Sequence, residues 1–355
     1  MFEPPVTKLP VAVLGATGTV GQRFIALLAD HPWFEVVAVT GSERTAGQRY
    51  GDAVQWIQST PLPATVAAMT IAHDIPSRPV VMGFSALTSD VAGRLETALA
   101  DQGLFVVSNA SSHRMDPDVP LVVPEVNPDH LALVRHQRFG GGGALATNPN
   151  CSTIGLVLAL KPLHDAFGLE AVSVVTMQAI SGAGLPGVPS LAITDNVIPF
   201  IGGEEEKLES ETQKILGRHL GGRVEPAAIT VSAQCNRVPV VDGHLECASF
   251  RLARPATAEA IAEVLSSFTA APQSLRLPSA PPRPVLVAER PDRPQTRLDR
   301  DAGGGMAVTV GRIRPCPLLG WKMVLLSHNT VRGAAGGALL VGELAVAQGL
   351  VAGTA

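Results

Sequence analysis

The feature that most constrains the fold is a glycine-rich turn directly after a short apolar segment. Residues 11–14 are all apolar, as in a strand buried on both faces of a sheet. Gly15, Gly18 and Gly21 follow at intervals of three, and a helical pattern of apolar residues continues over residues 24–28. This order predicts an α/β domain that binds a dinucleotide, because such a turn exposes backbone N–H groups to the pyrophosphate. The alternative is a tight turn in an α/β domain that binds no nucleotide.

The end of the second predicted strand, residues 35–40, bears on the choice of cofactor. Sites specific for NAD usually carry an acidic residue there, which binds the ribose hydroxyl groups. Ser42 and Arg44 follow this strand instead, and an arginine suits the additional 2′-phosphate of NADP. These residues favour NADP, whereas Glu43 leaves NAD as the alternative.

Two further strands are predicted at residues 80–85 and 104–109. Ser85 ends the first of them, at the carboxyl edge where an open parallel sheet binds its ligands. Arg114 follows the second strand and is a candidate anion ligand, because a guanidinium group can bind phosphate through two hydrogen bonds. The alternative for Arg114 is an ordinary surface charge.

The candidate nucleophile is Cys151, within the sequence Asn-Pro-Asn-Cys-Ser-Thr that precedes an apolar run at residues 154–163. This pattern places Cys151 in the first turn of a helix, where Ser152 and Thr153 are expected to cap. The positive end of the helix dipole is expected to lower the pKa of the thiol, and free backbone N–H groups there can bind an oxyanion. The alternative is a small buried cysteine without a chemical role.

Polar residues after this helix follow strand ends and turns. A strand predicted at residues 172–179 carries Gln178 near its end, and a loop containing Ser181 and Gly182 can approach a cofactor. Three glutamates at residues 204–206 begin the next predicted helix, where acidic residues complement the helix dipole. One of the three is free to face a substrate amine.

A histidine follows a predicted turn in the second half of the chain. Residues 229–235 and 245–252 are predicted strands, and Asp242-Gly243 between them predicts a hairpin turn. His244 comes directly after this turn, where a strand end can bring it to a site. From its position alone, an exposed histidine without a role is the simpler interpretation.

The remaining segments complete a second domain. Residues 257–268 are predicted as an amphipathic surface helix, and residues 306–313 and 321–326 as strands. The segment at residues 277–300 is rich in proline and arginine, so we expect an extended excursion at a subunit contact. A helix rich in glycine and alanine at residues 332–347 is expected to pack back onto the nucleotide-binding domain.

Composition narrows the possible classes of function. Of 355 residues, 46% are hydrophobic and 16% charged, which indicates a folded globular protein. A net charge of −4 argues against nucleic acid as a partner. The four cysteines lie far apart without metal-binding spacing, which indicates free thiols in a reducing compartment and no metal site. Since no apolar run reaches membrane-spanning length, we expect a cytoplasmic protein without a membrane partner.

Taken together and in order, the motifs resemble those of the aspartate-semialdehyde dehydrogenases, most closely the branch found in archaea, fungi and some bacteria. The resemblance covers nearly the whole chain, and the combination is far more specific than any single motif. The motifs that carry it are Gly15-Ala16-Thr17-Gly18-Thr19-Val20-Gly21, Ser108-Asn109-Ala110 with Arg114-Met115, Pro124-Glu125-Val126-Asn127, Asn148-Pro149-Asn150-Cys151-Ser152-Thr153, Gln178-Ala179-Ile180-Ser181-Gly182, Glu204-Glu205-Glu206-Lys207, Arg237-Val238-Pro239-Val240 and Gly243-His244.

The resemblance assigns roles at matching positions. It implies that Cys151 is the nucleophile and His244 the acid/base group, while Arg237 binds the substrate carboxylate. Glu204 would face the substrate amine, with Glu205 as the alternative. Further substrate contacts would be Gln178 and Asn150, phosphate ligands Arg114 and Lys207, and cofactor contacts Thr17, Gly18, Thr19, Val20, Ser42, Ser181, Gly182 and Asn329, in addition to Gly15, Arg44 and Ser85.

The predicted fold is α/β, with an N-terminal Rossmann-type NADP-binding domain at residues 1–147. A catalytic and dimerisation domain of the α+β class, with a mixed sheet, is predicted at residues 148–328. The glycine run at residues 140–143 marks the boundary between them. Residues 329–355 would form the C-terminal helix that packs on the NADP-binding domain, and the chain would form a homodimer or homotetramer.

The reaction implied is the NADPH-dependent reductive dephosphorylation of L-aspartyl 4-phosphate to L-aspartate 4-semialdehyde through a thioester at Cys151. This reaction belongs to the aspartate pathway to lysine, threonine and methionine. The nearest alternative is a malonyl-CoA reductase or another acyl reductase on the same scaffold, against which Glu204 argues because a malonyl group has no amine. A non-catalytic NADP-binding sensor or scaffold is disfavoured by the joint presence of Cys151, His244, Arg237 and Lys207.

Overall fold

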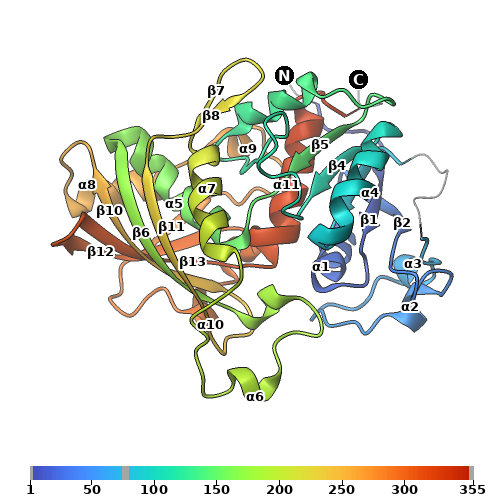
Figure 1. Ribbon diagram of the computed structural model, residues 1–355, viewed down its shortest axis with the longest axis horizontal. Helices are drawn as coiled ribbons and strands as arrows, with labels where there is room; N and C mark the ends of the chain where they lie inside the picture. The colour runs from blue at the N-terminus through green and yellow to red at the C-terminus, as the bar shows by residue number, and fades with distance from the viewer. Residues whose placement is uncertain (1–2, 74–79, 352–355) are drawn as a thin grey trace.

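Five parallel strands form the N-terminal sheet, in the order β2-β1-β3-β4-β5 (Figure 1). The computed structural model describes residues 3–73 and 80–351. The sheet contains mostly buried residues, which explains its continuous apolar sequences. Chain order reverses between β1 and β3, and open α/β sheets bind ligands at the carboxyl ends beside such a point. The strands are β1 (Leu9–Leu14), β2 (Phe34–Val39), β3 (Met82–Ser85), β4 (Phe105–Ser108) and β5 (Ala144–Thr147).

Helices cover both faces of the N-terminal sheet. On one face, α1 (Thr19–Leu28) and α11 (Gly336–Ala347) share an apolar core with Phe84 of β3. On the other face, α4 (Ser89–Asp101) contributes Leu99 to a second, smaller core. The final helix therefore completes the core of the first sheet, although the mixed-sheet elements lie between them in the chain (Figure 1).

Six strands form the second sheet, in the order β11-β12-β13-β10-β6-β9. Its outermost pairs, β11 with β12 and β6 with β9, are parallel, and the pairs between them are antiparallel. Together with the parallel N-terminal sheet, this mixed sheet confirms the predicted fold class. The strands are β6 (Leu169–Gln178), β9 (Thr230–Arg237), β10 (His244–Leu252), β11 (Val285–Ala288), β12 (Val308–Cys316) and β13 (Gly320–Ser327).

Three helices pack on one face of the mixed sheet: α5 (Cys151–Phe167), α7 (Glu204–Ile215) and α8 (Ala258–Ser266). Their apolar residues share one core with alternate residues of the strands, as the period of two along a strand requires. The strand residues between these, such as Ser173 on β6 and Gln234 on β9, are exposed on the opposite face of the sheet.

Two predictions for this sheet are wrong. Asp242-Gly243 does not form a hairpin, because β6 lies between β9 and β10. The connection instead hydrogen-bonds to residues after β6, with the N–H of Ile180 donating to the carbonyl of Val240 at 2.8 Å. The segment at residues 277–300 is not wholly an excursion, because it contains edge strand β11.

Short elements connect these layers, and among the described residues no helix is long and apolar enough to span a membrane. The short elements are α2 (Tyr50–Ala53), α3 (Ala64–Ala67), η1 (Pro128–His136), η2 (Ile180–Ala183), α6 (Ser190–Ile193), β7 (Arg218–His219), β8 (Val224–Glu225), α9 (Ala271–Ser274), α10 (Thr296–Asp299), η3 (Ala302–Gly305) and η4 (Val331–Ala335).

Candidate active site

Cys151 is the first residue of α5, at the point where the chain leaves the N-terminal sheet. The cap of this helix is Asn150, whose side-chain oxygen accepts hydrogen bonds from the N–H groups of Ser152 at 2.9 Å and Thr153 at 3.4 Å. The expectation that Ser152 and Thr153 would cap is therefore wrong, and the hydroxyl groups of both are buried without a hydrogen-bond partner. Asn150 sets the direction in which the chain enters α5 and so fixes the position of Cys151.

Cys151 and His244 form a close pair, with Sγ 3.2 Å from Nε2. The backbone N–H of Ala179 donates to Nδ1 of the same ring at 3.0 Å. Since Nδ1 accepts this hydrogen bond, the hydrogen of the neutral ring lies on Nε2 and points to the sulfur. The connection that replaces the expected hairpin thus brings His244 beside the end of β6 and selects its tautomer.

Burial keeps both members of this pair neutral. Burial and the nearby Glu204 carboxylate raise the pKa of Cys151 to about 12, although Arg114 and Arg237 act in the opposite direction. Burial also lowers the pKa of His244 to about 3, and Arg237 adds to that effect. The backbone N–H of Ser152 at the helix start does lower the thiol pKa, as expected, but the expected net decrease is wrong because desolvation of the thiolate outweighs this effect.

A cavity of about 400 Å³ opens beside Cys151 and gathers residues from both sheets. Ten of the residues predicted for catalysis, substrate, phosphate or cofactor line it, although they are spread from α1 to the loop before η4. These are Val20, Arg114, Asn150, Cys151, Gln178, Ser181, Gly182, Glu204, Arg237 and Asn329. A single space is thus shared by the nucleophile, a carboxylate and two guanidinium groups.

Arg237 and Gln178 lie on adjacent strands, at the ends of β9 and β6. Arg237 donates through Nη1 to the carbonyl of Ala179 at 2.7 Å, which fixes the guanidinium group while leaving other N–H donors for a ligand. Gln178 donates to the hydroxyl of Thr176 at 3.3 Å and to Glu204 at 3.4 Å. This arrangement can bind a carboxylate at one end of the cavity.

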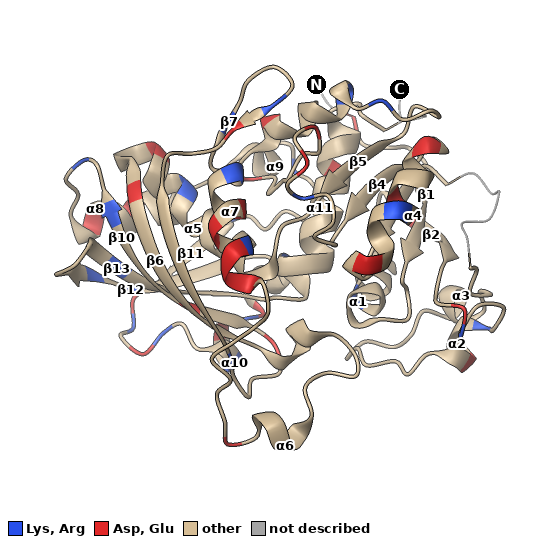
Figure 2. Ribbon diagram, viewed as in Figure 1, with Lys and Arg blue, Asp and Glu red and all other residues tan. Residues whose placement is uncertain are grey.

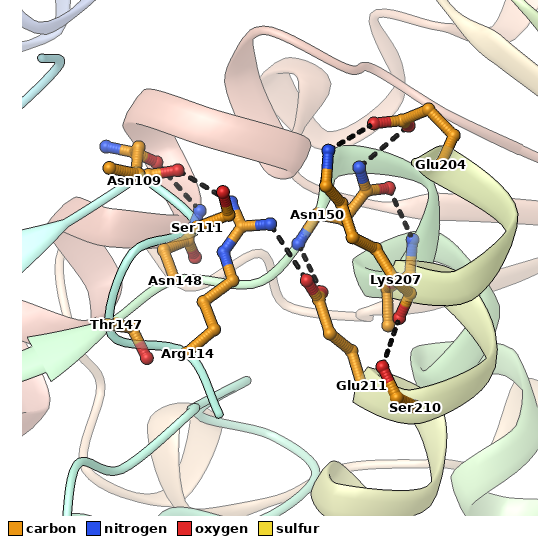
Figure 3. Close-up of polar contacts among 12 residues, drawn as sticks. Asn109, Ser111, Arg114, Thr147, Asn148, Asn150, Glu204, Lys207, Ser210 and Glu211 are labelled. Carbon is orange, nitrogen blue, oxygen red and sulfur yellow. Dashed lines mark hydrogen bonds and ion pairs between the residues drawn. The ribbon is translucent and has the colours of Figure 1, made fainter. Parts of the chain in front are cut away.

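Glu204, at the first turn of α7, is the glutamate that faces the cavity. It accepts hydrogen bonds from the side chains of Asn150 at 2.8 Å and Lys207 at 3.3 Å (Figure 3). Glu205 instead accepts the backbone N–H of Cys235 at 2.9 Å, so it holds α7 to β9. Between the two predicted alternatives, only Glu204 is therefore placed to meet a ligand.

Arg114 reaches the cavity from the loop after β4, and its partner Glu211 was missed by the sequence reasoning. Nη1 of Arg114 donates to Glu211 at 2.9 Å, and Nη2 donates to the carbonyl of Asn109 at 2.6 Å (Figure 3). The available signal was helical spacing, because Glu204, Lys207 and Glu211 recur at intervals of three and four residues on one face of α7.

The glycine turn between β1 and α1 fits a pyrophosphate. A Cβ at Gly21 would collide with the carbonyl oxygen of Gly15, so the helix can start this close to the strand only with glycine at residue 21. Gly18 is the N-cap of α1, and no side chain caps it, in contrast to α5. Thr17 precedes the cap, and Thr19 with Val20 forms the first turn, where the N–H groups of a helix start have no partner within the helix and can bind an anion.

The other predicted cofactor residues lie at separate places around this turn. Ser42 and Arg44 are both exposed in the loop after β2, whereas Ser85 is fully buried at the carboxyl end of β3. Asn329 donates to the hydroxyl of Ser181 at 2.8 Å and accepts the N–H of Gly243 at the same distance. Asn329 therefore connects the loop containing Ser181 and Gly182 with the segment that carries His244.

Comparisons with known proteins find relatives along nearly the whole chain. A family model described as "Semialdehyde dehydrogenase, NAD binding domain" matches residues 10–134, and one described as "Semialdehyde dehydrogenase, dimerisation domain" matches residues 160–332. The chain is 51% identical to aspartate-semialdehyde dehydrogenase from Archaeoglobus fulgidus over 353 residues, which are 97% of this chain and 100% of the relative. The corresponding protein from Schizosaccharomyces pombe is 48% identical, with 96% and 99% covered.

A solved structure extends this similarity to three dimensions. The crystal structure of aspartate semialdehyde dehydrogenase with NADP from Candida albicans matches the fold with a TM-score of 0.89 and 45% sequence identity. The match covers 96% of this chain and 99% of that chain. Both domains of the fold and their connection are therefore shared with that structure.

Proposed function

The chain belongs to the aspartate-semialdehyde dehydrogenase family, and from this premise we propose how its residues carry out the family's reaction. The proposed reaction is the reductive dephosphorylation of L-aspartyl 4-phosphate to L-aspartate 4-semialdehyde, with NADPH as the reductant. The observation that carries this proposal is the Cys151–His244 pair, with Sγ and Nε2 3.2 Å apart, beside a cavity that holds Glu204, Arg237 and Arg114 together.

Four charged side chains match the three charged ends of the proposed substrate. Arg237 would bind the α-carboxylate, because a guanidinium group can donate two parallel hydrogen bonds to it. Glu204 would bind the ammonium group, with Gln178 and Asn150 holding the Glu204 carboxylate in place. The acyl phosphate would then extend toward Arg114 and Lys207.

In the first chemical step the Cys151 sulfur attacks the acyl carbon, which forms the C–S bond and breaks the bond from that carbon to the phosphate oxygen. The thiol proton leaves with the departing group, so the products are the thioester and hydrogen phosphate. The substrate ammonium neutralises Glu204, which removes one of the contributions that raise the thiol pKa. Arg114 and Lys207 bind the leaving phosphate, and in the reverse direction they hold it for attack on the thioester.

NADPH, when bound, supplies the hydride that reduces the thioester carbon. The glycine turn at Gly15, Thr17, Gly18 and Thr19 would hold its pyrophosphate, and Ser42 with Arg44 would hold its 2′-phosphate. His244 donates a hydrogen bond from Nε2 to the oxygen that becomes negatively charged, and the tautomer set by Ala179 suits that role. Collapse of the tetrahedral adduct re-forms the carbonyl group, releases the aldehyde and expels the Cys151 thiolate, which takes a proton from solvent to restore the thiol.

The test is a phosphate-dependent assay with aspartate semialdehyde and NADP, in which absorbance of the reduced cofactor is followed for the wild type and Cys151→Ala. Turnover that requires phosphate and is lost in the variant supports the proposal. Malonyl-CoA reduction without turnover of aspartate semialdehyde would instead show that the substrate is wrong. Binding of NADP without either turnover would leave only the sensor or scaffold alternative.

The domain limits, assembly and location are part of the same proposal. We place the domain limits at residues 1–147, 148–328 and 329–355, because β5 ends at Thr147 and β13 ends at Ser327. The match to a dimerisation domain supports a homodimer, and light scattering would distinguish it from a homotetramer. We also propose a cytoplasmic location, because all four cysteines are free thiols, which cell fractionation would test.

A further inference from the structure

Helix α7 carries a row of alternating charges on one face. Glu204, Lys207, Glu211 and Lys214 recur at intervals of three and four residues, which places them on the same side of a helix. Figure 2 shows that α7 carries both acidic and basic residues. The first two belong to the proposed substrate site, whereas Glu211 and Lys214 lie further along the helix and have no role in that mechanism.

Glu211 joins two parts of the candidate active site that belong to different segments. It is 1% exposed, and both of its carboxylate oxygens are used. Oε1 accepts from Nη1 of Arg114 at 2.9 Å, and Oε2 accepts from the backbone N–H of Asn150 at 2.7 Å (Figure 3). One buried carboxylate therefore fixes the guanidinium group relative to the residue directly before Cys151.

Lys214 holds the loop that carries Arg114. Its ammonium group donates to three backbone carbonyls, those of Arg114 at 2.7 Å, Asp116 at 2.8 Å and Val119 at 3.0 Å. Lys214 thus holds the main chain of this loop against α7. Glu211, three residues earlier on the same helix, holds the Arg114 side chain. Helix α7 therefore fixes both the main chain and the side chain of Arg114.

The free donors of Arg114 point to a role beyond charge neutralisation. A guanidinium group has five N–H donors, and contacts with Glu211 and Asn109 use one from each terminal nitrogen. Arg114 lines the cavity beside Cys151, while Glu211 is not among the residues that line it. The hydrogen bonds of Glu211 therefore reach a ligand in this cavity through Arg114 and Asn150.

We propose that Glu211 is a positioning residue that sets the phosphate-binding orientation of Arg114 relative to Cys151. This inference rests on the proposed function only for the identity of the anion, which is phosphate. Removing one of the two acceptor oxygens of Glu211 would release either Arg114 or the Asn150 loop, so phosphate affinity would fall. Binding of the substrate carboxylate at Arg237, which Glu211 does not contact, would change little.

The experiment measures phosphate binding without turnover. Cys151 of the full-length protein is alkylated with iodoacetamide at increasing concentrations of inorganic phosphate, and modification of the Cys151 peptide is quantified by mass spectrometry. In Glu211→Gln, the phosphate concentration that halves the alkylation rate should rise on the order of tenfold, the effect of losing one charge-assisted hydrogen bond. Glu206→Gln is the matched control, because Glu206 is exposed on the same helix and loses the same charge.

Steady-state kinetics give the second measurement. We expect Glu211→Gln to raise KM for phosphate while leaving KM for aspartate semialdehyde within about twofold. Glu211→Asp keeps the charge and should recover part of the phosphate affinity, and it replaces the glutamine variant if that variant does not fold.

Three results would overturn the inference. The first is that phosphate protects Cys151 of Glu211→Gln from alkylation as well as it protects the wild type. The second is that Glu211→Gln raises KM for phosphate and KM for aspartate semialdehyde equally. The third is that phosphate fails to protect a wild-type enzyme that turns over aspartate semialdehyde. If the wild type shows phosphate protection and the Glu211→Gln shift but no turnover, the inference stands and the proposed function fails.

Discussion

Gly333 lies against the nucleophile, so that a Cβ atom at Gly333 would be 2.8 Å from Cβ of Cys151 and 3.0 Å from its Cα. Gly333 belongs to η4 and also lines the cavity. Because part of the obstacle is backbone, a side chain at residue 333 cannot be accommodated by a change of rotamer. Segment η4, which directly precedes α11, therefore fixes where the first turn of α5 can lie.

Replacement of Gly333 by alanine should impair turnover more than stability. We expect kcat to fall about 100-fold, because displacing a reacting group by about 1 Å can cost that much. Steady-state assay and thermal unfolding of Gly333→Ala would measure the two effects. Gly93→Ala is the matched control, since its new Cβ would meet Ser112 at an ordinary 3.5 Å. Wild-type kcat in Gly333→Ala would contradict this prediction.

The alkylation rate of Cys151 should rise with pH without a plateau between pH 7 and 10. The thiol pKa is raised to about 12, so the thiolate fraction grows about tenfold per pH unit below that value. Iodoacetamide labelling of the Cys151 peptide over this range is the measurement. A plateau below pH 8 would show that the pair is already a thiolate and an imidazolium.

Glu204→Gln should make Cys151 more reactive toward iodoacetamide while reducing turnover. The Glu204 carboxylate raises the thiol pKa, so its removal lowers that pKa and increases the thiolate fraction, by roughly fivefold at pH 8. The same change removes the proposed partner of the substrate ammonium and should raise KM for aspartate semialdehyde. Glu206→Gln should alter neither quantity, and slower labelling of Glu204→Gln would refute the electrostatic explanation.

Arg44→Ala should discriminate between the two nicotinamide cofactors. If Arg44 binds the 2′-phosphate, KM for NADPH should increase about tenfold, because a charge-assisted hydrogen bond is lost. KM for NADH, which lacks that phosphate, should change by less than about twofold. Arg49→Ala, which removes another exposed arginine from the same loop, serves as the comparison. Equal changes for both cofactors would exclude this role.

Replacing only one member of the buried ion pair between Arg332 and Glu125 should strongly destabilise the folded protein. Both side chains are fully buried, and Nη1 donates to Oε1 at 2.8 Å. Arg332→Met should lower the free energy of unfolding by about 3–5 kcal/mol, because the Glu125 carboxylate is left buried and unpaired. Urea denaturation would measure this loss, and the double variant with Glu125→Gln should recover part of it. A loss below about 1 kcal/mol would mean that water reaches the site.

Local patterns in the sequence predicted the elements well but not all of their pairings. The strand, glycine turn and helix at residues 11–28 required only neighbouring residues, and the structure has them where expected. Asp242-Gly243 carried a genuine turn signal, yet β6 from much earlier in the chain separates β9 from β10. Edge strand β11 was missed because its four residues, within a proline-rich segment, are too few to show a period.

In the candidate site, too, local patterns predicted individual residues but not the contacts between distant segments. Cys151 and His244 each had a local context, but their 3.2 Å contact depends on the order of strands in the mixed sheet. Glu211 could be placed on the face of α7 shared by Glu204, but its partners lie in two other segments. The thiol pKa also depends on burial, which cannot be inferred from the residues that begin a helix.

The position of α11 has a consequence for synthesis of the protein. Its residues Leu339 and Leu340 share one core with Phe24 and Phe84 near the other end of the chain. Strands β1 to β4 leave the ribosome first, yet only α1 covers this face of their sheet until α11 has emerged. The domain that is translated first is therefore completed last, and Gly333, which lies directly before α11 in η4, reaches Cys151 only after both sheets have been translated.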